Sequence, residues 1–255
     1  MTSRANFWII LLQGKPKSAK DWRVHYQHTG PDLEKTARRR RFGMKRFNPA
    51  GHSLDLGPND VHVWCADLDM ASADLATFET YLGPDERTRA HCFYFSRDRD
   101  RFICAHGLLR EILSSHSGQP PASFRFSYGK SGKPEALQSS SRIPNFNHSR
   151  SSNMAVFTFA RDRAVGIDIE HIEDDQQFFH IATQYYTHSE NVILNNLSGG
   201  AKITEFFSYW TRLEVYLKAT GEGLGHLGND LELKSPVLFP RRHDRVDAAI
   251  GRTGS

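Results

Sequence analysis

The sequence predicts an α+β fold, and three features of the chain lead to this prediction. Residues 61–68 and 164–170 are short apolar stretches rich in β-branched side chains, a composition typical of buried strands. Residues 100–116 and 204–221 are longer and repeat apolar side chains at helical spacing. The chain has 255 residues, 38% of them hydrophobic, and a chain of this length buries roughly 70–75% of its unfolded surface in one domain or two smaller lobes.

Residues 1–57 differ from the rest of the chain. They contain the basic stretches KPKSAKDWR and ARRRRFGMKRF, end in turn-forming residues, and sustain no apolar period. We therefore expect a poorly ordered or loosely attached basic extension. The run Arg38–Arg41 is a candidate for nucleic-acid binding, although a solvated basic arm explains such a run more often.

Regular structure is expected to begin near Asp60. The stretch VHVWCADL (61–68) alternates as a strand does, Pro84 and Asp85 open a helix, and a longer helix follows at 100–116. The other expected elements are strands at 124–128, 145–149 and 154–160, and a turn with two lysines at 129–134 (GKSGKP).

The second half repeats this mixture of strands and helices. After the strand at 164–170, Thr187 and Glu190 have the spacing of a capping box, which predicts a helix from His188. The longest helical pattern covers 204–221, and Gly221 stands where a left-handed C-cap belongs. A final strand is expected at 231–235.

Composition narrows the environment of the protein. The net charge of +4 favours an anionic partner, such as phosphates, an acidic protein or nucleic acid. The three cysteines form no CxxC pair, so we expect buried reduced thiols and no zinc site or disulfide framework. The apolar run at 7–12 is too short to span a bilayer and lacks the features of a signal peptide. We therefore expect a cytoplasmic protein with no membrane partner.

The strand at 164–170 carries two acids, Asp168 and Glu170, on one face, because residues i and i+2 of a strand point the same way. Two unpaired carboxylates this close repel each other, and a divalent cation with oxygen ligands, such as Mg²⁺, removes the conflict. Glu214 and Lys218 likewise share one face of the long helix. The alternatives are a solvated acidic face on an edge strand and an ordinary surface ion pair, worth about 0.3–0.5 kcal/mol.

Two stretches in this order, GIDIE and then WTRLEVYLKATGEGL, resemble the motifs of the 4′-phosphopantetheinyl transferases of the type that activates surfactin synthetase. That family has a GxDxE strand followed by a W-x-x-K-E-A-x-x-K-x-x-G-x-G-L helix. The stretches LGPDERTRAHCFYFSRDRDRFICAHGLLREIL, YGKSGKP and NFNHSRS extend the resemblance over about residues 61–235. It implies a pseudo-dimer of two similar α+β lobes with coenzyme A between them. We expect lobes at 58–154 and 155–255, and the second lobe carries the metal site.

The resemblance also implies a role for individual residues. Asp168, Glu170 and Glu214 match the acids that hold Mg²⁺ on the diphosphate of coenzyme A. Glu214 and Lys218 are the expected catalytic residues: Glu214 assists deprotonation of the acceptor serine, and Lys218 neutralises the leaving 3′,5′-ADP. The residues expected to contact coenzyme A are Arg89, Arg101, Lys133, Ser149 and Arg150.

The activity implied is transfer of the 4′-phosphopantetheine arm of coenzyme A to a serine of an apo acyl or peptidyl carrier protein, dependent on Mg²⁺. One alternative is a degenerate, non-catalytic relative that binds coenzyme A or a carrier protein. The other is a nucleic-acid-associated basic protein. Binding to nucleic acid that falls steeply with salt and survives loss of Asp168 would favour this alternative.

The chain departs from the family pattern in three places. Leu213 replaces the first lysine of the helix motif, Arg150 replaces the histidine of the serine–histidine pair, and few strands are expected after 224. We therefore expect an incomplete sheet in the second lobe and a weak enzyme whose activity rises on Leu213→Lys. Arg212 is adjacent but lies about 100° around the helix from that position.

Overall fold

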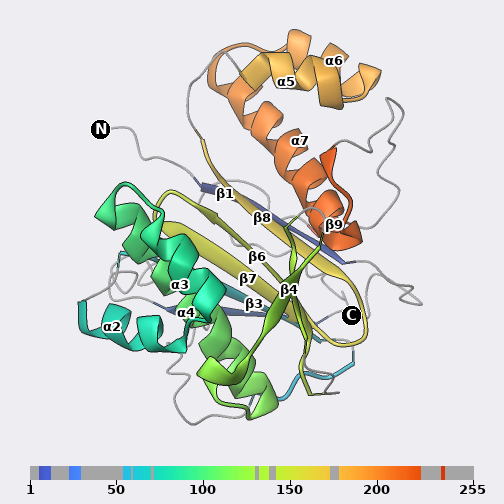
Figure 1. Ribbon diagram of the computed structural model, residues 1–255. Helices are drawn as coiled ribbons and strands as arrows, with labels where there is room; N and C mark the ends of the chain where they lie inside the picture. Colours follow the sequence, from blue (N-terminus) through green and yellow to red (C-terminus); the bar gives the residue numbers. More distant parts are fainter. Residues whose placement is uncertain are drawn as a thin grey trace, which may run out of the picture.

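A computed structural model describes residues 6–12, 23–29, 54–58, 60–69, 72–129, 132–137, 142–172, 178–224 and 237–238. It confirms the α+β class. Helices α2–α4 lie on one side of the molecule and α5–α7 on the other, with the strands running between them (Figure 1). None of the helices in these ranges is long and apolar enough to cross a membrane.

The strands form two main sheets. One has the order β2-β3-β7-β6 and the other the order β8-β1-β9, while β4 and β5 pair as a separate hairpin. The bounds are β1 (Asn6–Leu12), β2 (Arg23–Thr29), β3 (Asp60–Asp67), β4 (Phe126–Tyr128), β5 (Pro134–Ala136), β6 (Asn145–Ser151), β7 (Met154–Ala160), β8 (Val165–His171) and β9 (Val237–Leu238).

The helices confirm most of the sequence-based expectations. Their bounds are α2 (Ser72–Tyr81), α3 (Pro84–His91), α4 (Ser96–Ser117), α5 (Phe178–Tyr185), α6 (His188–Asn195) and α7 (Gly199–Thr220), with a short 3₁₀ turn η2 (Pro121–Ser123). Helices α2 and α5 were not expected from the sequence, and they are only ten and eight residues long. The capping box of α6 forms, since Thr187 Oγ1 accepts from Glu190 N–H at 3.3 Å and Glu190 Oε2 accepts from Thr187 N–H at 3.0 Å.

The two halves of the chain repeat one series of elements. The series β3-α2-α3-α4 recurs as β8-α5-α6-α7 roughly 105 residues later. Both long helices have 22 residues and end at a glycine with positive φ, Gly118 at 75° and Gly221 at 79°. Only glycine adopts that left-handed C-cap conformation without a steric penalty. The chain therefore contains one α+β series twice, while the lobe bounds at 58–154 and 155–255 stay a prediction.

Side chains of β6 connect the two sheets by reaching to β8. Asn147 Oδ1 accepts from the Ile167 backbone N–H at 2.9 Å, and Ser151 Oγ accepts from the His171 N–H at 3.0 Å. Between them, Ser149 Oγ donates to Asp168 Oδ1 at 2.8 Å. Alternate side chains of β6 therefore hydrogen-bond to β8, where two paired strands would use backbone hydrogen bonds. Strand β8, which carries Asp168 and Glu170, lies at the junction of the lobes.

The expectation of a poorly ordered extension over 1–57 is wrong for two of its segments. Strand β1 pairs antiparallel with β8, with Ile9 opposite Asp168, and strand β2 pairs parallel with β3. A continuous apolar run such as 7–12 can form a strand without alternating apolar and polar residues, which is why the absence of a period was misleading. The run Arg38–Arg41 lies outside the described residues.

Strand β1 is also a strand of the second sheet that was not expected from the sequence. It is the middle strand of the sheet β8-β1-β9, so the N-terminal part of the chain supplies a strand to the second lobe. The strand expected at 231–235 lies outside the described residues, and β9 begins two residues beyond that range, at Val237.

Three clusters of buried apolar side chains form the core of the described residues. The largest lies between α2–α4 and the strands β3, β6 and β7 and contains Trp64 and Phe102. The second includes Val63 and Ile167 and packs β8 against β3 and β7. The third is the largely aromatic interior of α5–α7, around Phe206. Because Ile167 and Ile169 belong to the second cluster, the acidic side chains that alternate with them point away from it.

The cysteines agree in part with the expectation of buried thiols. All three are free; Cys104 is buried, Cys65 is half-buried and Cys92 is exposed. Burial raises the pKa of Cys65 and of Cys104 to about 12, which keeps both as neutral thiols.

Candidate active site

Helix α7 lies directly on strand β8, and Gly166 makes this approach possible. A Cβ at this position would lie 2.2 Å from the Val215 carbonyl oxygen and 2.9 Å from the Ala219 nitrogen. Only a glycine lets the backbone of the strand touch the backbone of the helix in this way. The contact brings Glu214 and Lys218 of the helix to the acidic face of the strand.

Asp168 occupies the centre of the site and is buried. Its Oδ1 accepts hydrogen bonds from Ser149 Oγ at 2.8 Å and from the Lys218 ammonium, which also donates to Ser149 Oγ at 3.0 Å. Its Oδ2 is buried and has no hydrogen-bond partner among the described residues. Burial raises the pKa of Asp168, and the Lys218 charge opposes that rise.

Two further carboxylates share this low-dielectric region. Glu170 Oε1 accepts from Trp210 Nε1 at 3.1 Å, and burial together with the Asp168 charge raises the pKa of Glu170 to about 7. Burial also raises the pKa of Glu214. Three carboxyl groups whose ionisation is disfavoured create a place where a positive ion is stabilised.

The three carboxylates do not form a complete set of metal ligands in this structure. No three His, Cys, Asp or Glu side chains in the described ranges lie close enough together to hold a metal ion. The Lys218 ammonium supplies the positive charge beside Asp168 instead. The unpartnered Oδ2 of Asp168 and the oxygen-only donor set nevertheless fit a hard cation such as Mg²⁺.

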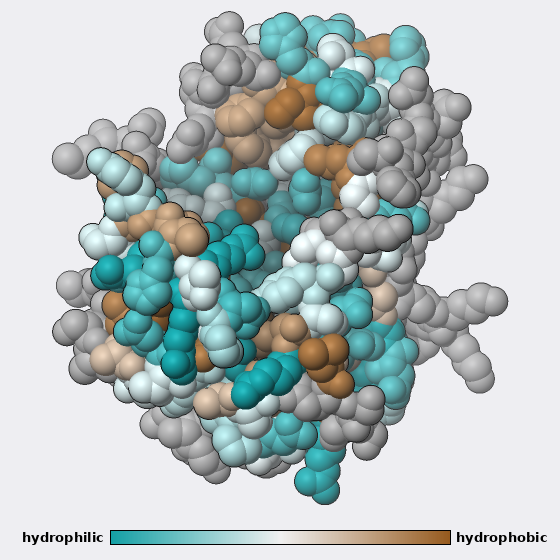
Figure 2. Space-filling model, viewed as in Figure 1, coloured by the Kyte–Doolittle hydropathy of each residue, from teal (hydrophilic) through white to brown (hydrophobic). Residues whose placement is uncertain are grey.

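A cavity of about 390 Å³ opens beside Glu214 and Lys218. Its walls come from both lobes, and Figure 2 shows a hollow with hydrophilic walls between the helices α5–α7 and the rest of the molecule. The predicted residues that line the cavity are Arg89, Lys133, Arg150, Glu214 and Lys218.

Arg89 and Arg150 contribute two guanidinium groups to the wall of this cavity. Their guanidinium groups lie over the Phe102 ring, at 5.6 Å and 5.7 Å from its centroid. Burial lowers the pKa of Arg150, and the nearby Arg89 charge lowers it further. Two arginines that repel each other and face a cavity suit a phosphate group, which each can bind through two hydrogen bonds.

Lys133 fixes the lysine-bearing turn to the second lobe. Its ammonium donates to the carbonyl oxygens of Val165, at 3.4 Å, and Ala219, at 3.5 Å. These carbonyls lie at the start of β8 and the end of α7, and burial lowers the pKa of Lys133. The side chain therefore positions the turn as well as lining the cavity.

Four of the predicted residues do not line this cavity: Asp168, Glu170, Arg101 and Ser149. Arg101 forms a two-point ion pair with Asp69, at 2.6 Å and 2.9 Å, and lines a neighbouring cavity of about 550 Å³ together with Glu170 and Arg150. Ser149 lies behind the cavity, where it holds Asp168 and Lys218 in place. An ion pair between residues 32 positions apart cannot be read from a local pattern.

Two residues at the positions of departure also lie away from the cavity. Leu213 is buried, with 5% of its surface exposed. The Arg212 guanidinium lies 5.8 Å from the centroid of the Tyr209 ring, on the same helix. Neither side chain lines the cavity, so Arg212 does not take the place of the family's lysine in this structure.

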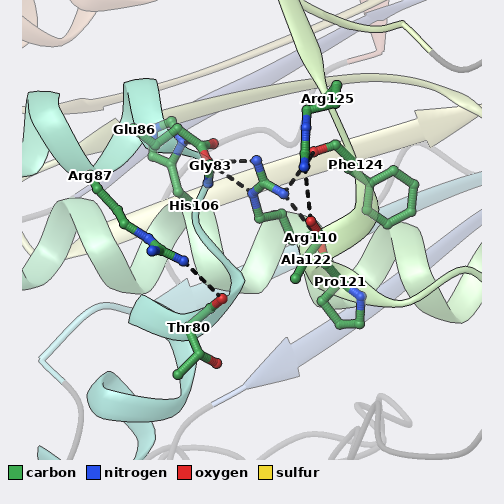
Figure 3. Close-up of polar contacts among 10 residues, drawn as sticks. All are labelled: Thr80, Gly83, Glu86, Arg87, His106, Arg110, Pro121, Ala122, Phe124 and Arg125. Atoms are coloured by element: carbon green, nitrogen blue, oxygen red, sulfur yellow. Dashed lines mark hydrogen bonds and ion pairs between the residues drawn. The ribbon is translucent and has the colours of Figure 1, made fainter.

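The sequence analysis missed a buried polar network under the cavity (Figure 3). Glu86 accepts from Arg110 Nε at 2.9 Å, lies 2.9 Å from His106 Nδ1 and accepts from the N–H of Gly83 at 2.7 Å. Burial opposes its ionisation, but the His106 and Arg110 interactions lower the pKa of Glu86 to about 2. The network holds α3 to α4. The i, i+4 spacing of His106 and Arg110 was the signal that could have revealed it.

The comparisons with known proteins agree with this geometry. A model of the 4′-phosphopantetheinyl transferase superfamily matches residues 164–249. The 4′-phosphopantetheinyl transferase HetI of Nostoc sp. is 35% identical over 182 residues, which cover 70% of this chain and 76% of that protein. The chain belongs to the 4′-phosphopantetheinyl transferase superfamily. It is accordingly a transferase.

Other relatives in the superfamily are more distant. A phosphopantetheinyl transferase of Thraustochytrium sp. is 29% identical over 182 residues, 66% of this chain and 63% of that protein. The human L-aminoadipate-semialdehyde dehydrogenase-phosphopantetheinyl transferase is 29% identical over 153 residues, 56% of this chain and 50% of that protein. The chain thus spans between about half and three quarters of the length of these curated relatives.

Proposed function

We propose that the chain transfers the 4′-phosphopantetheine arm of coenzyme A to a serine of an apo acyl or peptidyl carrier protein. One observation carries this proposal: a single cavity is lined by Arg89 and Arg150 of the first lobe and by Lys218 of α7, whose ammonium pairs with the buried Asp168. Coenzyme A has a 3′-phosphate and a diphosphate, so its two anionic groups require two separate cationic regions.

We propose that different cationic residues bind the different phosphate groups of coenzyme A. Arg89 and Arg150 bind the 3′-phosphate, and Lys133 holds the turn that closes the nucleotide end. Lys218 donates to the diphosphate and neutralises the leaving 3′,5′-ADP. Phosphoryl transfer depends mainly on such positioning and charge neutralisation.

A divalent cation belongs to this proposal. Asp168, Glu170 and Glu214 would hold Mg²⁺, which supplies further neutralisation of the diphosphate when it is bound. Glu214 is also the residue proposed to take the proton of the acceptor serine, whose oxygen forms the new bond to phosphorus as the bond to 3′,5′-ADP breaks.

The second candidate is a relative that binds coenzyme A without turnover. The observation that favours it is the departure from the family's motif at Leu213, where a buried apolar side chain stands in place of a lysine. We also propose that the protein is located in the cytoplasm. Its three cysteines are free, as is usual in that reducing compartment.

Mass spectrometry of an apo carrier protein tests the proposal. We expect one phosphopantetheine to be added in the presence of coenzyme A and Mg²⁺. The variant Asp168→Asn keeps the shape of the side chain and removes its charge, and we expect it to abolish the mass gain and the Mg²⁺-dependent part of coenzyme A binding. The control is Asp74→Asn, an exposed acid on α2, for which we expect parental turnover.

Each outcome of this experiment separates the alternatives. Coenzyme A binding without any mass gain supports the non-catalytic relative. Unchanged turnover in Asp168→Asn contradicts the metal assignment. Because Asp168 is buried against Lys218, circular dichroism of the variant must show the parental fold before loss of turnover is interpreted.

A further inference from the structure

The imidazole of His148 lies in the wall of the cation-lined cavity but takes part in none of the polar contacts described above. Its ring stacks on Phe157 at 6.0 Å and meets the His106 ring edge-on at 5.6 Å. Its Nδ1 is buried and has no hydrogen-bond partner within the described part of the chain. A buried polar atom without a partner costs stability, so packing alone does not explain a histidine at this position.

The groups around His148 are mostly cations. Lys218 approaches from α7 and Arg150 from the same strand, and His106 faces it from α4. Glu86 of α3, the acid whose charge acts on it, is already bound to His106 and Arg110. The other charged groups in the same cavity wall are Arg89, Lys133, Glu214 and Glu222.

These surroundings make His148 a neutral imidazole in the ligand-free protein. Burial lowers its pKa to about 3, with further lowering by the His106, Lys218 and Arg150 charges. A phosphate that enters between Arg150 and Lys218 reverses this balance, because its negative charge favours the imidazolium form. A half-turn of the ring about its Cβ–Cγ bond exchanges Nδ1 with Cδ2, so either nitrogen can face the ligand without repacking.

We propose that His148 is a further ligand-contacting residue, which hydrogen-bonds a phosphate group of coenzyme A and takes up a proton from solvent as the ligand binds. The proposal rests on the proposed function, because it takes coenzyme A as the ligand. It assigns to this side chain the part of the phosphate site between Arg150 and Lys218.

Calorimetric titration of the parent protein and His148→Phe with coenzyme A tests the proposal. At pH near 7, titrations in buffers with different heats of ionisation give the number of protons taken up per ligand. We expect the parent to take up more protons than His148→Phe, by at most one. We expect the variant to bind coenzyme A about 10–100-fold more weakly, as for loss of a charge-assisted hydrogen bond.

A structural role for His148 predicts a different result. If the histidine only supported the fold, the ligand-free variant would melt at a lower temperature. We expect its melting temperature to be unchanged or higher, because phenylalanine removes an unpaired buried polar atom. The control is His188→Phe, an exposed position on α6, for which we expect parental proton uptake and affinity.

The outcomes also separate this proposal from the proposed function. Equal proton uptake and equal affinity in parent and His148→Phe overturn the role of His148 while coenzyme A binding by the parent still stands. A parent that binds no coenzyme A overturns the proposed function itself. If the variant does not fold, ¹⁵N NMR of the His148 ring in the parent decides, and a ring that stays neutral after coenzyme A is added overturns the proposal.

Discussion

Leu213 is the residue at which the structure changes a sequence-based expectation most directly. The family motif has a lysine here, and the sequence analysis expected Leu213→Lys to raise activity. The leucine is buried, with 5% of its surface exposed, so a lysine would place an ammonium in an apolar site.

We now expect Leu213→Lys to lower the free energy of unfolding, by at least about 2 kcal/mol. Urea denaturation of the variant and of Leu213→Met measures the effect. The methionine keeps volume and apolarity, and it should cost less than about 1.5 kcal/mol. A lysine variant as stable as the parent, with faster turnover, would restore the original expectation.

His116 determines part of the pH dependence of stability. It is buried at the end of α4, and burial, followed by the His62 charge, lowers its pKa to about 3. The ordinary value in an unfolded chain is about 6.5, so the unfolded state binds a proton between these two values and the folded state does not. Stability should therefore fall as pH decreases from about 6.5 towards 3, with a slope of at most about 1.4 kcal/mol per pH unit for this group.

The variant His116→Phe tests this dependence. Its ring would continue the contact with Phe159, whose centroid lies 5.2 Å away. We expect the loss of stability between pH 6.5 and pH 5 to be smaller in the variant than in the parent, measured by urea denaturation at each pH. The exposed His188→Phe variant should show the parental slope, and a parental slope in His116→Phe would contradict the assignment.

Strand β1 is the element on which the geometry of the site depends. It pairs with β8 along the whole acidic strand and is the central strand of its sheet. A loosely attached extension over 1–57 was expected from the sequence, and a protein that starts near Pro58 tests this expectation. Such a protein lacks β1 and β2, so we expect it to lose the coenzyme A site.

A proline in β1 tests the same dependence without a deletion. Ile10 has a partner on both sides, Ile167 of β8 and Leu238 of β9, so its N–H belongs to one of the two ladders. We expect Ile10→Pro to cost at least about 1–3 kcal/mol of stability and to weaken coenzyme A binding. The control is Ser96→Pro at the first position of α4, which tolerates proline. Parental stability and coenzyme A affinity in Ile10→Pro would show that β1 does not support the site.

The two long helices α4 and α7 occupy equivalent places in the repeat but carry different polar groups. Each has the same length and the same glycine C-cap, but their buried polar groups differ. In α4 the arginine and histidine bind Glu86 and connect helices, whereas in α7 Lys218 binds an acid on a strand. The site therefore arises from unequal use of two similar lobes.

The charge of the whole molecule bears on its encounter with a carrier protein. The net charge is +4, and Arg97, Arg101 and Arg150 line the cavity next to Glu170. An acidic carrier domain should therefore be attracted over a distance comparable to the Debye length, about 10 Å at 0.1 M salt. We expect kcat/KM for the carrier protein to fall as salt is raised, while kcat at saturating carrier changes little. A kcat/KM that does not change with ionic strength would contradict electrostatic steering.

The sequence by itself determined the elements whose signals are local. The strand at 164–170, the helix from His188 and the long helix that ends at Gly221 follow from spacings of two, three and four residues. The same spacings placed Asp168 and Glu170 on one face of a strand and Glu214 and Lys218 on one face of a helix. The family followed from the order of these two motifs.

Only the tertiary structure decided which remote segments meet. Strand β1 joins β8 across more than half of the chain, because a strand's partner is set by backbone hydrogen bonds and burial that leave no local mark. Three other features likewise depend on distances between separate elements. They are the ion pair of Arg101 with Asp69, the burial of Leu213 and the position of the Lys218 ammonium beside Asp168. Electrostatic energies and burial depend on those distances, so residue type and spacing alone could not predict them.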